Sequence, residues 1–138
     1  MIRAAQADYL LIPLLDGQLG VAQVIDIVGD TPFCALTNRR VASPGPQSPL
    51  QKRDIIAFTR IEPSAIAAGL WPLAGYDQLP LDLPQADADT PVHDPAVIEA
   101  FMSAWHGLYP WDGFGDLFDQ IKRPDIDGPD LDRPAPAT

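Results

Sequence analysis

The sequence contains few residues that form covalent or metal-based sites. There is one cysteine among 138 residues, which excludes an internal disulfide. Cys34 lies between Phe33 and Ala35, and we expect it to be a small buried side chain rather than a reactive thiol. The two histidines, His93 and His106, do not form a ligand cluster with it. We therefore expect no bound metal and no cofactor.

Catalytic motifs are equally scarce. The sequence has no G-x-S-x-G nucleophile elbow, phosphate-binding loop or dinucleotide fingerprint. His106 with Asp112 would form an oriented base, but no nucleophile lies nearby in the sequence. A favourable interaction with a helix C-terminus also explains His106. The sequence thus predicts a protein that is not an enzyme.

Long apolar runs are absent. The longest, Leu10 to Leu15, falls far short of the roughly 20 residues that a membrane-spanning helix needs. Residues 1–8 contain one arginine and no apolar run, so they do not resemble a signal peptide. We expect a cytoplasmic protein without a membrane partner, and the single cysteine is consistent with a reducing compartment.

Basic residues are also few, and their distribution is uneven. The chain has 9 Lys and Arg against 19 Asp and Glu, a net charge of −10. Residues 1–76 carry six side chains of each sign, so the whole excess lies in residues 77–138. An acidic half repels nucleic acid and anionic lipid and attracts basic protein surfaces, although solubility alone would also account for it. The functional interpretation is a basic protein partner and no nucleic acid.

What the sequence does contain is a strong hairpin signal from Tyr9 to Val28. Asp16-Gly17 between two apolar runs is typical of a two-residue turn. This turn places Leu15 opposite Gln18 and collects one apolar face: Leu10, Ile12, Leu14, Leu19 and Val21. Further strands are predicted over Phe33–Leu36 and Asp54–Ile61.

The loop between those strands, Ala42–Pro49, is rich in proline and serine. Basic residues at its two ends suggest either an anion site or a solvated loop end: Arg39, Arg40, Lys52 and Arg53. Farther along the chain, Trp71 is expected to be buried in the core, and Leu79–Pro91 to form an extended connector over the surface.

The best helix signal covers Asp94–Gly107. Asp94 is a suitable N-cap, Pro95 suits the first helical position, and Gly107 suits the left-handed C-terminal stop. Its apolar stripe is predicted to be Val97, Phe101, Ala104, Trp105 and Leu108. Shorter helices are predicted over Ser64–Ala68 and Leu117–Ile121.

Together these elements predict an α+β fold: a curved antiparallel β-sheet or small open barrel of four to six strands, with the C-terminal helices packed on it. We expect a single domain over residues 1–122. Residues 123–138, rich in proline and aspartate, are expected to form a mobile acidic tail.

The segment from Tyr109 to Asp116 has too many aromatic and glycine residues for a plain loop. Tryptophan is over-represented at binding hot spots, and glycines around it favour partial exposure. We predict partner contacts from Tyr109, Trp111, Asp112 and Asp116. The alternative is that Trp111 closes the core under the last helix.

Two motifs resemble those of a known family. Leu11-Ile12-Pro13-Leu14 with Asp16-Gly17 and Gly20–Val24 resembles the opening hairpin of the bacterial immunity protein 26 family, and Gly69–Tyr76 is similar to its G-x-W-P-x-x-G segment. The acidic connector, the His106–Asp112 segment and the tail depart from the family pattern. The resemblance implies a small, mostly β immunity protein that binds and neutralises a partner toxin of the polymorphic-toxin kind. It implies no catalytic residues.

A second hypothesis stands beside that one. The chain would be a regulatory or small-ligand-binding module, with its ligand held between sheet and helix and lined by Trp71, Trp105 or Trp111. A pocket of several hundred Å³ at that place would favour this hypothesis. An acidic, aromatic-rich convex face would favour the immunity protein.

Overall fold

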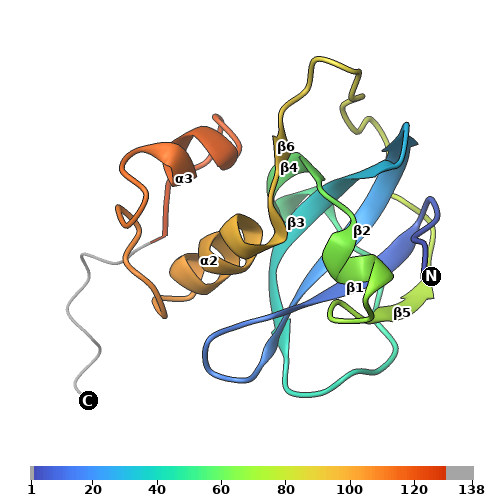
Figure 1. Ribbon diagram of the computed structural model, residues 1–138, viewed down its shortest axis with the longest axis horizontal. Coiled ribbons are helices and arrows are strands. Elements are labelled where there is room, and N and C mark those ends of the chain that lie inside the picture. Colours follow the sequence, from blue (N-terminus) through green and yellow to red (C-terminus); the bar gives the residue numbers. More distant parts are fainter. Residues whose placement is uncertain (1, 130–138) are drawn as a thin grey trace.

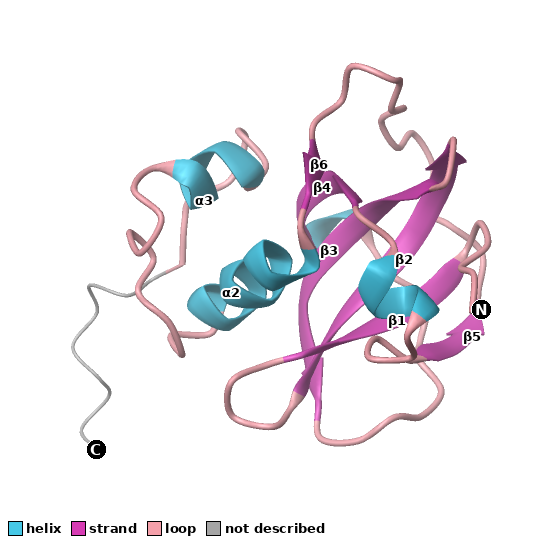
Figure 2. Cartoon of the chain, viewed as in Figure 1, coloured by secondary structure: helices cyan, strands magenta, loops and turns pink. Residues whose placement is uncertain are grey.

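The computed structural model of the chain describes residues 2–129 and has an α+β fold (Figures 1 and 2). Its strands are β1 (Asp8–Pro13), β2 (Leu19–Val28), β3 (Thr31–Val41), β4 (Ile55–Ile61), β5 (Leu73–Tyr76) and β6 (Val92–His93). Its helices are α1 (Ser64–Ala67), α2 (Pro95–Trp105) and α3 (Leu117–Ile121), with a short 3-10 helix η1 (Lys52–Asp54) before β4.

The sheet is mixed and open, with strand order β5-β1-β2-β3-β4-β6. Neighbouring strands from β5 to β4 are antiparallel, as predicted, whereas β6 pairs parallel with β4. A parallel pair needs a long crossover connection, and α1, β5 and the acidic connector supply it. The two residues of β6 carry no apolar pattern, so the sequence had no signal for this parallel edge.

The first hairpin forms where predicted, but its turn is longer. Gly17 has φ +84°, whereas Asp16 does not have a positive φ. The Gly17 N–H donates to the Leu14 carbonyl (3.1 Å) and the Leu14 N–H donates to the Gln18 carbonyl (2.8 Å). Leu14 therefore faces Gln18 across a three-residue loop that ends in a left-handed glycine.

This longer turn moves the strand register by one residue, so the predicted pairing was wrong. Leu11 lies opposite Val21 and Ile12 lies opposite Gly20. Because side chains alternate along a strand, a one-residue change exchanges the two faces of β2. Val21 consequently packs with Tyr9 and Leu11 rather than with Ile12.

Both faces of the sheet are covered, by different parts of the chain. Helix α2 lies across one face and α3 lies beyond it, as Figure 1 shows. The main core on this side includes Leu10, Ile12, Ala22, Val24, Leu36, Ile66, Trp71, Ile98, Phe101, Met102 and Phe118. On the opposite face, loops take the place of helices: Leu50 packs with Tyr9 and Leu11, and Leu79 and Leu83 pack near Phe33.

Helix α2 has the predicted ends but is rotated about its axis. The Asp94 carboxylate accepts the Ala96 N–H (2.8 Å), and Gly107 has φ +77°. The buried face contains Ile98 and Met102 together with the predicted Phe101 and Ala104, while the predicted Val97, Trp105 and Leu108 are only half-buried. Apolar residues flank the stripe on both sides, so the spacing alone did not select its centre.

Two close contacts position α2. A Cβ atom at Gly20 would lie 2.7 Å from Cε of Met102, so glycine lets the flexible end of this α2 side chain lie directly on β2. Trp71 is fully buried, which confirms its predicted place in the core. Its indole N–H donates to Oε2 of Glu99 on α2 (2.8 Å).

The first residues of the predicted tail contact the body. The Arg123 N–H donates to the Ile56 carbonyl (2.8 Å), its guanidinium donates to the Lys52 and Ile55 carbonyls, and Ile126 packs against the main core. The rest of the predicted tail, residues 130–138, lies outside the described residues. Within residues 2–129, no helix combines the length and apolar character needed to cross a membrane.

Candidate protein-binding surface

Several basic side chains of this chain bind its own backbone. Arg60 on β4 is 9% exposed and donates to the carbonyls of Asp87 (3.2 Å), Ala88 (3.2 Å) and Thr90 (3.1 Å) in the acidic connector. Two of its nitrogens also donate to the Thr31 hydroxyl, at 2.9 and 2.6 Å. The arginine thus holds the connector against the sheet, and its hydrogen bonds are to neutral oxygens.

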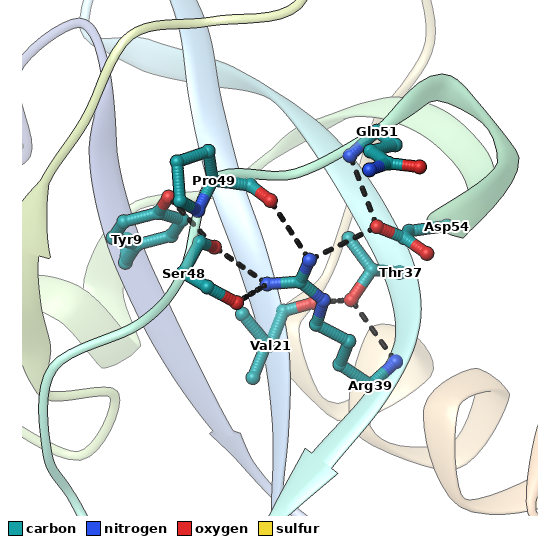
Figure 3. A network of polar contacts seen from close by, with 8 residues as sticks. All are labelled: Tyr9, Val21, Thr37, Arg39, Ser48, Pro49, Gln51 and Asp54. Carbon is teal, nitrogen blue, oxygen red and sulfur yellow. Dashed lines mark hydrogen bonds and ion pairs between the residues drawn. The ribbon is translucent and has the colours of Figure 1, made fainter.

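Arg39 acts in the same way on the loop after β3 (Figure 3). It donates to the carbonyls of Ser48 (2.6 Å) and Pro49 (2.8 Å) and pairs with Asp54 (3.0 Å). The Tyr9 hydroxyl donates to the same Ser48 carbonyl (3.2 Å). Of the two hypotheses for this loop end, the arrangement favours the one without an anion, because oxygens of the loop already surround the guanidinium.

The carboxylates, unlike these arginines, make few contacts with distant parts of the chain. In the part of the chain that the structure describes, ion pairs link Arg39 to Asp54, Arg40 to Asp16, and Arg123 to Asp125, and these are the only three. Most other carboxylates cap local turns or face solvent. The net charge of −10 is therefore carried by carboxylates of which most in the described residues are exposed.

The predicted site segment folds into an aromatic cluster beside α2. Trp111 lies 5.5 Å from Phe101, 5.4 Å from Phe118 and 6.0 Å from Trp105, measured between ring centroids. Tyr109 stacks on Phe114 at 5.9 Å. Edge-on and offset aromatic contacts of this kind stabilise a fold beyond the area they bury.

The four predicted contact residues lie in this region with different exposures. Asp112 and Asp116 are exposed, whereas Tyr109 and Trp111 are half-buried. The Trp111 indole donates to Oδ1 of Asp119 (2.9 Å), so one edge of the ring faces the acidic surface while its face covers Phe101. This position agrees with the alternative that Trp111 closes the core, and it still leaves part of the ring accessible.

Sequence reasoning missed two residues of this surface. Phe114 is 43% exposed and is the most accessible ring of the cluster, and Asp119 orients Trp111. Phe114 belongs to the same aromatic, glycine-rich segment, which was a sufficient signal. The sequence contained no signal for Asp119, because its contact with Trp111 depends on how α3 folds back on the loop. We call Tyr109 to Asp119 the acidic aromatic surface.

His106 does not pair with the acidic side chains of the acidic aromatic surface in the described structure. The structure shows no hydrogen bond between His106 and Asp112, and Nε2 of His106 is buried without a partner among the described residues. Burial lowers the pKa of His106, the nearby Arg40 lowers it further, and Asp16 opposes this effect. The oriented base considered from the sequence is therefore not formed.

The single cysteine lies in the core. Cys34 is fully buried, as expected, and burial raises the pKa of its thiol. Among residues 2–129, no three His, Cys, Asp or Glu side chains are grouped as metal ligands would be.

Among the clefts of the described surface, three lie near the segments discussed above. One of about 450 Å³ lies between α1, the β2–β3 turn and the N-terminal residues, and no tryptophan lines it. A second of about 390 Å³ is lined by Trp105 and Ile126, and a third of about 200 Å³ lies between the first hairpin and α2.

Comparison of this chain with protein-family models, with curated proteins and with solved structures finds no match.

Proposed function

We propose that this chain is a non-catalytic, immunity-type protein that binds a basic toxin domain and neutralises it. The resemblance of two motifs, the opening hairpin and Gly69–Tyr76, to the immunity protein 26 family supports this proposal. We also propose that the sheet is curved and that the C-terminal helices pack on it. Such a sheet would give the binding surface the rigid support that it needs.

One observation carries the proposal: three arginines donate to the chain's own carbonyls, while most carboxylates of the described residues are exposed. Arg39, Arg60 and Arg123 all stabilise loops, so they contribute little positive surface. A protein with this arrangement attracts a basic partner over long range and repels a second acidic one. Complementary charge of this kind mainly accelerates association.

We assign the contact to the acidic aromatic surface. Asp112 and Asp116 supply exposed charge, and Phe114, Tyr109 and the edge of Trp111 supply apolar area beside it. Aromatic anchors surrounded by polar groups are typical of binding hot spots.

The test is co-expression with the product of the neighbouring gene, followed by pull-down and stopped-flow association at several salt concentrations. We expect the association rate to fall as salt rises, with a much smaller change in dissociation. The double variant Asp112→Asn, Asp116→Asn should slow association. The matched control Asp30→Asn, Asp82→Asn removes two exposed carboxylates elsewhere and should slow it less. An association rate that ignores salt, or equal effects of both variants, would reject this surface.

The small-ligand module remains a second candidate, placed at the 450 Å³ cleft beside α1 and not at the tryptophan-lined position expected from the sequence. Its size lies within the ~300–1,000 Å³ range of ligand sites, and its walls include Ile27, Pro32 and Ile66. A set of apolar fragments tested by NMR should then shift the backbone amides of Ile66 and Ala67 in a saturable way. Absence of any saturable shift there would leave this candidate without support.

A further inference from the structure

The smallest of the three clefts differs from the other two because it is lined by a single charged side chain, a carboxylate. It measures about 200 Å³ and lies between the tip of the first hairpin and the exposed side of α2. This is below the ~300–1,000 Å³ typical of drug-sized ligands. Its walls are apolar: Pro13, Leu14, Leu15, Ala96 and Ala100.

Glu99 is the one charged side chain lining this cleft. The indole N–H of the buried Trp71 donates to Oε2 of Glu99, which ties the carboxylate to the core. Within residues 2–129, Glu99 has no basic partner. A half-buried carboxylate on apolar walls is a pre-organised acceptor for a cation, because it loses little freedom on binding.

Two other polar side chains complete the lining. Ser103 is 1% exposed, and its hydroxyl oxygen accepts the Leu15 N–H (3.2 Å), which holds the hairpin tip against α2. Tyr109 joins the cleft to the acidic aromatic surface, since it lines the cleft and also stacks on Phe114. The cleft is therefore continuous with the surface to which we assign partner binding.

We propose that this cleft receives one lysine or arginine side chain of the basic partner, with Glu99 as its ion-pair acceptor. The apolar walls contact the methylene groups, as long cationic side chains bury their stems against apolar surface. The inference rests on the proposed function for the identity of the partner, but the chemistry of the cleft can be tested without it.

The tryptophan side chains provide the measurement. In ¹⁵N-labelled protein at pH 7, the indole N–H of Trp71 reports on Glu99, and that of Trp111 reports on the exposed Asp119. Titration with n-butylguanidinium or n-butylammonium should shift the Trp71 signal in a saturable way and leave Trp111 nearly unchanged. The neutral isostere n-butanol should produce no comparable shift.

Two variants and one control decide the interpretation. Glu99→Gln removes the charge while keeping an oxygen for Trp71, and it should abolish the saturable shift. Ala96→Phe blocks the cleft from an exposed position and should do the same, which keeps the test valid if Glu99→Gln fails to fold. Asp119→Asn removes the equivalent carboxylate at Trp111 and should leave the Trp71 response intact. A wild-type protein without the shift, or an equal shift in the Ala96→Phe variant, would overturn the proposal.

Binding measurements with the partner protein distinguish a failure of this inference from a failure of the proposed function. If the neighbouring gene product binds, Glu99→Gln and Ala96→Phe should each weaken binding by about tenfold or more, as expected for a hot-spot contact. Unchanged partner affinity in both variants would overturn the cleft assignment and leave the proposed function standing. A saturable cation response at Trp71 with no basic partner would support the cleft and contradict the proposed function.

Discussion

Gly17 shows how one residue sets the geometry of the first hairpin. Its φ of +84° is costly for any residue with a Cβ, and nothing lies within 4 Å of a Cβ built there. Gly17→Ala should therefore destabilise the protein by ~1–2 kcal/mol through backbone strain alone. Denaturant unfolding measures this change.

Gly45 is the matched control for that substitution. It also has open space around its Cβ position, but its φ is not positive. Gly45→Ala should leave stability unchanged or raise it by ~0.5 kcal/mol, because alanine reduces the freedom of the unfolded chain. Equal effects at both glycines would mean that the positive φ of Gly17 does not strain an alanine at that position.

His106 makes stability depend on pH. Burial lowers its folded-state pKa below the ordinary 6.5, so the unfolded chain binds more protons in the interval between the two values. The free energy of unfolding should be highest above pH 6.5, fall as the pH drops through 6.5, and level off below the folded pKa. Denaturant unfolding at several values between pH 8 and pH 5 tests this sign.

Substitution of each histidine measures its own contribution to the pH dependence of stability. His106→Gln should reduce the loss of stability between pH 7 and pH 5. Burial also lowers the pKa of His93, so His93→Gln should remove a further part. A pH dependence that is unchanged in the double variant would assign the effect to the carboxylates.

At the scale of elements, the acidic connector is held by both apolar packing and hydrogen bonds. Residues 79–91 contain almost no regular secondary structure, yet Leu79, Leu83 and Ala86 cover the apolar face near Phe33. Arg60 donates hydrogen bonds to three carbonyls of the connector. Hydrogen bonds from a charged donor are stronger than those from a neutral one, so we expect Arg60 to contribute a large share of this stabilisation.

Arg60→Met should cost ~2–4 kcal/mol, because it leaves several carbonyls unpaired while keeping most of the apolar stem. Cleavage of the connector by a protease should accelerate at the same time. Arg53→Met is the control, since Arg53 is exposed and donates no hydrogen bond in the described structure. A connector that stays equally resistant in Arg60→Met would show that apolar packing alone positions it.

The whole molecule carries a net charge of −10, and three ion pairs link acidic to basic side chains within residues 2–129. Repulsion among the remaining acids opposes the compact state, and salt screens it. Raising NaCl from about 20 to about 200 mM should therefore increase the Tm by about 2–5 °C. The double variant Asp112→Asn, Asp116→Asn should show a smaller increase, and a Tm that falls with salt would indicate that ion pairs outweigh repulsion.

Most elements of the fold were predictable because their signals are local. Asp94, Pro95 and Gly107 define the ends of α2 within the segment itself. The α+β class follows from the same local patterns of alternation and helical spacing. The positions of Tyr109 and Trp111 beside acidic residues were also visible in the segment.

Tertiary structure decided how those elements meet. The parallel edge at β6, the rotation of α2 and the carbonyl partners of Arg39 and Arg60 all join residues that lie apart in the sequence. The cleft at Glu99 exists because Trp71, the hairpin tip and α2 converge there. Capping and turn preferences act within a few residues, whereas register, packing and buried hydrogen bonds depend on which distant groups satisfy one another, and only the folded chain settles that choice.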